Sequence, residues 1–153
     1  MRTEEEELLE LYTSLHQADR ELRHNAIAYY EPHPTQLKFH SSAARIRILL
    51  GGNRSGKSTA GACEAIAHAL GVRPWLNDGH PQHTVRLASG RAIPVPNIGT
   101  VLGESYKVAV DRVLWPTLSE WLPPDYVKRV GKNQQAVVDT VELKNGSVIR
   151  FMA

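Results

Sequence analysis

Eight consecutive residues at positions 51–58 have the types and the spacing that phosphate chemistry requires. They read GGNRSGKS and fit the pattern G-x-x-x-x-G-K-S. Glycine has no Cβ, so backbone N–H groups can curl around phosphate oxygens. Lys57 can then reach the β- and γ-phosphates, the Ser58 hydroxyl can ligate Mg²⁺, and Thr59 can bond the α-phosphate. The predicted nucleotide-binding residues of this loop are Gly51, Gly52, Asn53, Arg54, Ser55, Gly56, Lys57, Ser58 and Thr59.

Two elements must hold such a loop, and the sequence predicts both. Residues 46–50 form a short apolar run that ends at Gly51, which favours a buried strand. Residues 57–70 carry small and apolar side chains at helical spacing, and a helix N-terminus adds N–H groups and a positive dipole end. The order strand, loop, helix is the context that this phosphate-binding loop needs. The alternative is a glycine-rich turn that caps a core helix and leaves Lys57 solvated.

The segment before this strand, residues 32–42 (PHPTQLKFHSS), carries a possible base-recognition pair. The Gln36 side chain can pair with N6 and N7 of adenine, and Phe39 can stack on the purine. Several ATP-driven nucleic-acid motors select adenine in this way. A linker at a helix start with Phe39 in the core is the other reading, and the residues alone leave both open. His33 and His40 have no partner at metal-ligand spacing and are expected at the surface.

The N-terminal and middle segments are predicted from apolar spacing and turn residues. Residues 3–30 repeat apolar side chains at three- and four-residue steps, which predicts one long amphipathic helix that lies across the core or packs on a partner. Residues 1–31 form this N-terminal unit and residues 32–153 the body. Residues 71–97 are rich in proline and are expected to form an insertion with a hairpin across Ser89-Gly90. Its His80 and His83 are expected to be loop residues.

The last third of the body is predicted to hold a strand, a helix and a hairpin. Residues 98–103 are expected to form a second core strand, with Ser105 capping a helix that Pro116 kinks. Residues 136–143 and 147–152 flank a Lys-Asn-Gly turn, which predicts a β-hairpin. Trp115 and Trp121 are expected in the core, and Cys63, the single cysteine, as a buried, inert thiol.

Composition limits the class of protein without naming a function. A chain of 153 residues with 42% hydrophobic side chains is typical of one globular domain. No apolar run approaches the ~18 residues of a membrane span, and the acidic N-terminus differs from a signal peptide. Residues 1–31 carry eight acids and three bases, a net charge of −5, whereas the remainder carries fifteen bases and eight acids, a net charge of +7. A basic body suits a nucleic-acid partner, although an ordinary mildly basic surface explains the charge equally well.

Taken together, Gln36-x-x-Phe39-His40, GGNRSGKST, VLWPTLSEWLP and LKNGSVIRF resemble the N-terminal ATPase region of the large terminase subunit of tailed bacteriophages. The resemblance covers about residues 28–153. It implies an α/β fold with a partial P-loop NTPase core, in which a parallel sheet is flanked by helices and preceded by the long N-terminal helix. It also implies a motor that uses ATP and Mg²⁺ to drive double-stranded DNA into a procapsid, with Gln36 reading adenine and Arg54 acting on the γ-phosphate beside Lys57. The implied partners are the portal protein, the small terminase subunit and further copies in a ring, in the host cytoplasm.

A hydrolytic P-loop motor also needs an apolar strand that ends in Asp-Glu. The sequence holds no such strand: Asp139 is followed by Thr140, and Glu104 follows only Gly103. The resemblance places it after residue 153, so we expect a truncated chain that binds ATP but hydrolyses little, without the family's nuclease domain. Another nucleic-acid ATPase, helicase-like or portal-associated, and a small-molecule kinase are the alternatives.

Overall fold

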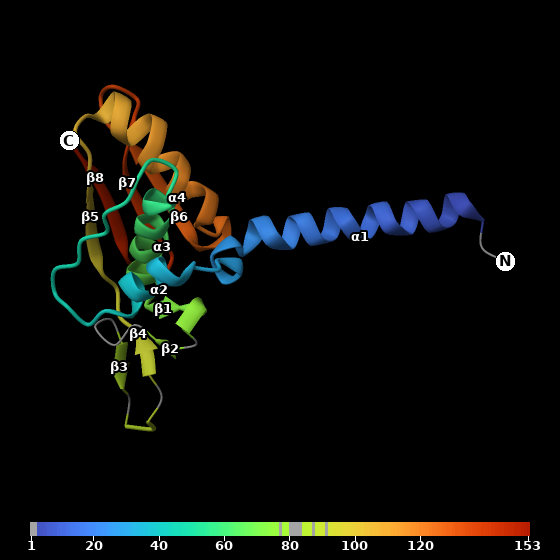
Figure 1. The fold of residues 1–153 in the computed structure, drawn as a ribbon, viewed down its shortest axis with the longest axis horizontal. Helices are drawn as coiled ribbons and strands as arrows, with labels where there is room; N and C mark the ends of the chain where they lie inside the picture. Colours follow the sequence, from blue (N-terminus) through green and yellow to red (C-terminus); the bar gives the residue numbers. More distant parts are fainter. Residues whose placement is uncertain (1–2, 77, 80–83, 87, 91) are drawn as a thin grey trace.

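The computed structural model describes residues 3–76, 78–79, 84–86, 88–90 and 92–153. It is a mixed α/β fold with one four-stranded sheet, two two-stranded pairs and a helical arm (Figure 1). The helices are α1 (Glu4–His24), η1 (Ala26–Tyr29), α2 (Pro34–Ser41), α3 (Lys57–Leu70), η2 (Pro74–Leu76), η4 (Tyr106–Leu114), α4 (Trp115–Trp121) and η5 (Pro124–Tyr126). The strands are β1 (Val72–Arg73), β2 (Asp78–Gly79), β3 (Thr84–Arg86), β4 (Ala92–Pro94), β5 (Ile98–Leu102), β6 (Val127–Lys132), β7 (Val138–Leu143) and β8 (Val148–Met152).

The arm is α1, and it projects away from the body (Figure 1). Thr3 begins it with a capping box: its Oγ1 accepts from Glu6 N at 3.3 Å, and Glu6 Oε2 accepts from Thr3 N at 3.0 Å. The predicted long helix is therefore confirmed over α1 but ends earlier than residue 30. Asn25, with φ −140°, leaves the helical region, and the chain tightens into the 3₁₀ turn η1. The expectation that this helix lies across the core is wrong.

The main sheet has the strand order β5-β8-β7-β6. Only β5 and β8 run parallel, and β8, β7 and β6 pair antiparallel. The β7–β8 hairpin confirms the Asn-Gly prediction, with Gly146 at φ 88° in the turn. The sheet is therefore mixed and not the parallel sheet that the resemblance implies, because the short turns that join β6, β7 and β8 leave no room for crossovers. Strand β6 was not predicted at all.

Residues 46–50 do not form a strand, which corrects the prediction on which the P-loop core depended. They lie outside the sheet without regular secondary structure, and Ile46, Ile48 and Leu50 are 82%, 76% and 84% exposed. A strand forms only against a neighbour that satisfies its N–H and C=O groups. No described strand supplies one to this segment. The loop at residues 51–56 therefore follows an unpaired segment and not the carboxyl end of a strand.

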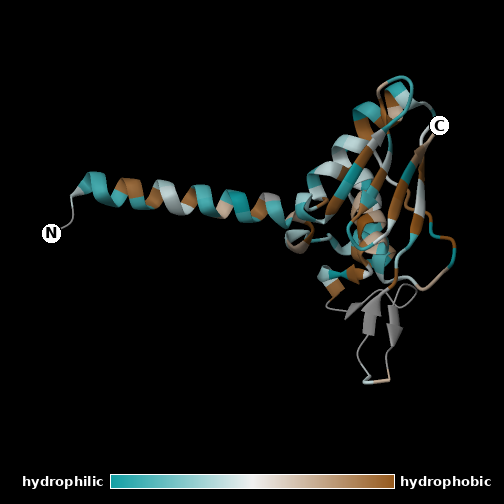
Figure 2. Cartoon of the chain, turned by 180° about the vertical axis from the view of Figure 1, so that it is seen from behind, coloured by the Kyte–Doolittle hydropathy of each residue, from teal (hydrophilic) through white to brown (hydrophobic). Residues whose placement is uncertain are grey.

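The core lies between the sheet and the helices α3, η4 and α4, and Figure 2 shows brown apolar segments gathered there. Helix α3 confirms its predicted bounds and ends at Gly71, whose φ of 73° suits the left-handed cap that glycine adopts easily. Cys63 is fully buried, and this burial, with Glu120 and Glu64 nearby, raises the pKa of its thiol. The burial and the raised pKa support the prediction that the Cys63 thiol is inert. Trp115 and Trp121 pack against this core, as predicted.

Ser105 begins the second helical stretch, and its Oγ accepts from Val108 N at 3.2 Å, which confirms the predicted cap. The first part, η4, is a π-helix: Val110 N donates to Ser105 O at 3.2 Å, five residues back. It passes into α4 at Trp115, next to Pro116, so the irregularity expected at this proline is a change of helix type. Leu122 ends α4 before the two prolines.

In the middle segment, β3 and β4 pair antiparallel across Ser89-Gly90 and confirm the predicted hairpin. His80 and His83 lie outside the described residues. Of the helices that the structure describes, none combines the length and the apolar character that crossing a bilayer would take.

Candidate functional site

The loop at residues 51–56 leads directly into the first turn of α3, and its backbone needs glycine at two places. Gly56 is the N-cap of α3 with φ 72°, a left-handed conformation. A Cβ there would lie 2.6 Å from Nε2 of Gln36, and a Cβ on Gly51 would lie 2.7 Å from Oγ of Ser55. Arg54 adopts φ 60° without being glycine. The loop is therefore tightly turned at Arg54 and Gly56 and closely packed against Gln36 and Ser55.

Lys57 bends back over this loop. Its Nζ donates to Gly51 O at 2.8 Å, to Gly52 O at 2.5 Å and to Ser55 Oγ at 3.1 Å. All three N–H groups of the ammonium are thus directed at the loop, and the positive charge lies in its mouth. Phosphate oxygens are charged acceptors and form stronger hydrogen bonds with an ammonium than neutral carbonyls do.

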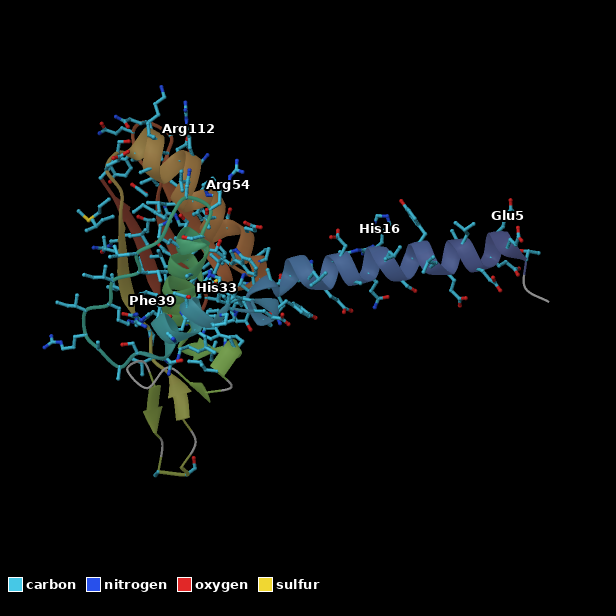
Figure 3. All side chains as sticks on the ribbon, viewed as in Figure 1. Glu5, His16, His33, Phe39, Arg54 and Arg112 are labelled. Atoms are coloured by element: carbon cyan, nitrogen blue, oxygen red, sulfur yellow. The ribbon has the colours of Figure 1, made fainter. Side chains whose placement is uncertain are left out.

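The amides of the first turn of α3 complete the loop. The bond from Ala60 N to Gly56 O, at 2.9 Å, is the first of the helix, so the N–H groups of residues 57–59 precede the helical ladder. Ser58 is exposed beside them, and Thr59 is half-buried. Asn53 and Arg54 are exposed at the tip, where Figure 3 labels Arg54. Residues 51–59 therefore all lie at or next to the N-terminus of α3.

A cavity of about 400 Å³ opens beside Lys57 and Ser58, between α3 and the edge strand β5. Its size falls within the range of small-molecule sites. Its floor is small and apolar, and Thr100 and Thr117 add hydroxyls. Gln36 is not among the residues that line it.

Gln36 is buried and contacts the loop itself. Its Nε2 donates to Gly56 O at 3.0 Å, and its Oε1 accepts from His33 N at 2.9 Å. His33 in turn places Nε2 3.4 Å from Ser55 O. Both ends of the Gln36 amide therefore support the loop and the start of α2. The structure brings Gln36 to the predicted site, in a supporting position that the sequence did not indicate.

Phe39 is half-buried, and the guanidinium of Arg47 lies over its ring with Cζ 4.9 Å from the centroid. Arg47 Nη1 also donates to Phe39 O at 3.1 Å. One face of the ring is thus covered by a cation–π contact. Phe39 could stack on a base only with its other face or after Arg47 moved.

A buried polar cluster joins α2 to α3, and sequence reasoning missed it. His40 Nδ1 lies 2.7 Å from Glu64 Oε2, and Tyr30 Oη lies 3.0 Å from His40 Nε2. Arg47 Nη2 lies 2.5 Å from Glu64 Oε1, and His68 Nε2 lies 3.4 Å from the same oxygen. The prediction that His40 is at the surface is wrong, because these partners let the imidazole be fully buried. His33 is exposed, as predicted.

Several cationic or protonatable side chains surround the Glu64 carboxylate in this cluster. Burial alone would raise the pKa of Glu64, but hydrogen bonds from His40, His68 and Arg47, with the Arg47 charge, outweigh it and hold the pKa well below the ordinary value. Burial, followed by Cys63 and Glu64, raises the pKa of Tyr30, which keeps its hydroxyl protonated beside His40 Nε2. The one signal that could have revealed the cluster was a glutamate in the middle of an alanine-rich helix.

Two further observations bear on the site. Among the described residues, no group of three or more His, Cys, Asp or Glu side chains is arranged to hold a metal ion. Comparisons with protein families, with curated proteins and with solved structures gave no match.

Proposed function

We propose that this chain binds ATP with Mg²⁺ through residues 51–59 and is the ATP-binding part of a viral DNA-packaging motor of the large-terminase kind. The observation that carries the proposal is the position of Lys57, whose ammonium lies in a tight glycine-containing loop at the start of α3. A cation and a helix N-terminus with unpaired N–H groups at one point suit a polyphosphate.

The residues of the loop suit a nucleoside triphosphate in three respects. Lys57 would bind the β- and γ-phosphates, and the amides of Gly56 to Thr59 would surround the phosphate oxygens. Ser58 is exposed next to Lys57 and would contribute its hydroxyl to Mg²⁺, with the phosphates as further ligands. Arg54, at the exposed tip, would approach the γ-phosphate. Mg²⁺ would neutralise charge on the phosphates.

The motor role rests on the resemblance and on charge. Residues 32–153 carry the net charge of +7 that favours a polyanion such as double-stranded DNA. The portal protein, the small terminase subunit and a ring of copies remain the proposed partners, and the host cytoplasm the proposed location. Another nucleic-acid ATPase is the second candidate. The Gln36-x-x-Phe39 pair, which belongs to the resemblance, favours either motor over a small-molecule kinase.

Calorimetric titration with Mg²⁺ and ATP tests the proposal. We expect weak, saturable binding of ATP, displacement of ATP by inorganic tripolyphosphate, and no displacement by adenosine, because the loop recognises phosphates. We also expect negligible release of phosphate, since an Asp-Glu strand is lacking. Displacement by adenosine and not by tripolyphosphate would reject the loop as the binding site.

Gln36→Ala separates base recognition from loop support. If Gln36 turns to the N6/N7 edge of adenine, the variant should lose the preference for ATP over GTP, an effect of about 1–3 kcal/mol. If Gln36 only supports Gly56, ATP and GTP should weaken equally and their ratio should stay constant. His33→Ala is the matched control, because it removes another side chain that contacts the loop, at Ser55 O, while the backbone N–H of residue 33 can still donate to Gln36 Oε1. Competition binding of ATP against GTP on the three proteins gives the ratio.

A further inference from the structure

The leucines of α1 face solvent along the whole arm. Leu8, Leu11 and Leu15 are exposed, and Leu22 is only partly covered where the arm meets the body. Figure 2 shows apolar and polar bands alternating along this helix, and Figure 3 shows side chains such as Glu5 and His16 reaching into open space. The arm is about 30 Å long at 1.5 Å per residue. A row of leucines of this length in water is unfavourable unless something covers it.

The spacing of the row is that of a coiled coil. Its members alternate three- and four-residue steps, which places them at successive a and d positions of a heptad. They are Leu8, Leu11, Leu15, Ala18 and Leu22. Leu9 is as exposed as Leu8, at 68% each, but falls at a b position on another face. The row therefore forms one seam, which we call the leucine seam.

The charged residues that flank the leucine seam determine whether a second α1 helix can pair with it in parallel or antiparallel. In a parallel pair each g residue faces the next e residue of the other helix, so Glu7 meets Tyr12, Ser14 meets Asp19, and Glu21 meets Ala26. None of these pairs opposes like charges. In an antiparallel pair Glu7 would face Glu21, and Glu5 would face Asp19, which is repulsive. The sequence of α1 is therefore compatible with its own parallel copy.

We propose that α1 pairs in parallel with α1 of a second copy through the leucine seam, so that two copies of this chain associate through their arms. The seam reaches the body at Leu22, which lines a mostly apolar pocket of about 320 Å³ with Ala26, Tyr29, Glu120 and Trp121. A parallel pair brings the two pockets to the same end, where the bodies meet. Helix α1 carries seven acids and two bases, a net charge of −5, so added salt should strengthen the pair by screening.

Sedimentation velocity over a wide range of protein concentration tests this proposal. The wild-type chain should rise from its monomer mass of 17.0 kDa toward twice that value. Leu15→Lys should weaken the association by roughly a hundredfold or more, since a charge replaces a leucine at the centre of the seam. Leu9→Lys, the matched control, should associate like the wild type. Neither change should alter thermal unfolding of the body, because both side chains are exposed in the monomer.

Cross-linking tests the orientation. Leu8→Cys lies at an a position, so a parallel pair brings two Cys side chains together and should yield a covalent dimer on oxidation, while buried Cys63 stays reduced. An antiparallel pair would place residue 8 near residue 18 and yield none. A wild-type chain that stays monomeric at every concentration, equal effects of the two lysine variants, or no cross-link at residue 8 would each overturn the proposal.

Discussion

Replacing Glu64 by alanine is expected to lower the free energy of unfolding by about 3 kcal/mol, the lower end of the range for breaking a buried ion pair. The carboxylate is nearly covered and compensates Arg47 while it bonds His40. Without it, the buried imidazole loses an acceptor and the guanidinium loses its counter-charge. Arg47 is 17% exposed and can turn toward water, which limits the loss. Urea unfolding followed by circular dichroism measures the effect.

Glu104→Ala is the matched control for this change. Glu104 is exposed, so removing the same carboxylate there should alter stability by less than about 0.5 kcal/mol. If Glu64→Ala proved as stable as Glu104→Ala, the cluster would not hold α2 against α3.

The pH dependence has a definite sign. The folded-state pKa of Glu64 lies below its unfolded value of about 4.3, so its stabilisation is complete above that value and is lost as pH falls below it. The stability difference between the wild type and Glu64→Gln should therefore be constant near neutral pH and should shrink in acid. A difference that grows in acid would contradict the charged state assigned to Glu64.

Lys57→Ala is expected to weaken ATP binding by about 1.5–3 kcal/mol, or roughly one to two decades in affinity. The side chain is half-buried over the loop and is the cation best placed for phosphate oxygens. Its removal should cost the fold little, because the ammonium bonds only loop groups at the edge of the body. Calorimetry with ATP gives the affinity, and thermal unfolding shows whether the fold persists.

Lys128→Ala provides the control, since Lys128 is exposed on β6, the strand farthest from β5 in the sheet. It lowers the net charge equally and should leave ATP affinity unchanged. Equal affinity of wild type and Lys57→Ala for ATP would remove the loop from the proposed site.

Local signals in the sequence were sufficient to predict the structure wherever a single residue determines it. Ser105 caps its helix through its own hydroxyl, and Gly71 ends α3 because it tolerates a positive φ. The Asn-Gly turn likewise gives the β7–β8 hairpin. Each feature depends on neighbours a few residues away, so the pattern carries the information.

The sequence-based predictions fail where a residue far away along the chain determines the local structure. Residues 46–50 have the composition of a buried strand, but composition cannot supply the neighbour that a strand needs. His40 resembles a surface residue until Glu64, 24 positions later, is brought against it. Strand β6 shows only a weak alternation of apolar and polar side chains, and it forms because β7 pairs with it. The role of Gln36 likewise depends on Gly56, 20 residues away.

The free edge of β5 has a consequence for how this chain behaves at high concentration. In the sheet that the structure describes, one side of β5 pairs with β8 and the other bears no strand, while Ile98 and Leu102 are exposed. A β-rich edge without lysine or proline along it is a template for adding further strands. Pro96 and Glu104 flank β5 and are the nearest residues that discourage such growth. We therefore expect strand addition at the free edge of β5 to limit the solubility of the chain. The resulting aggregates should have no fixed number of copies.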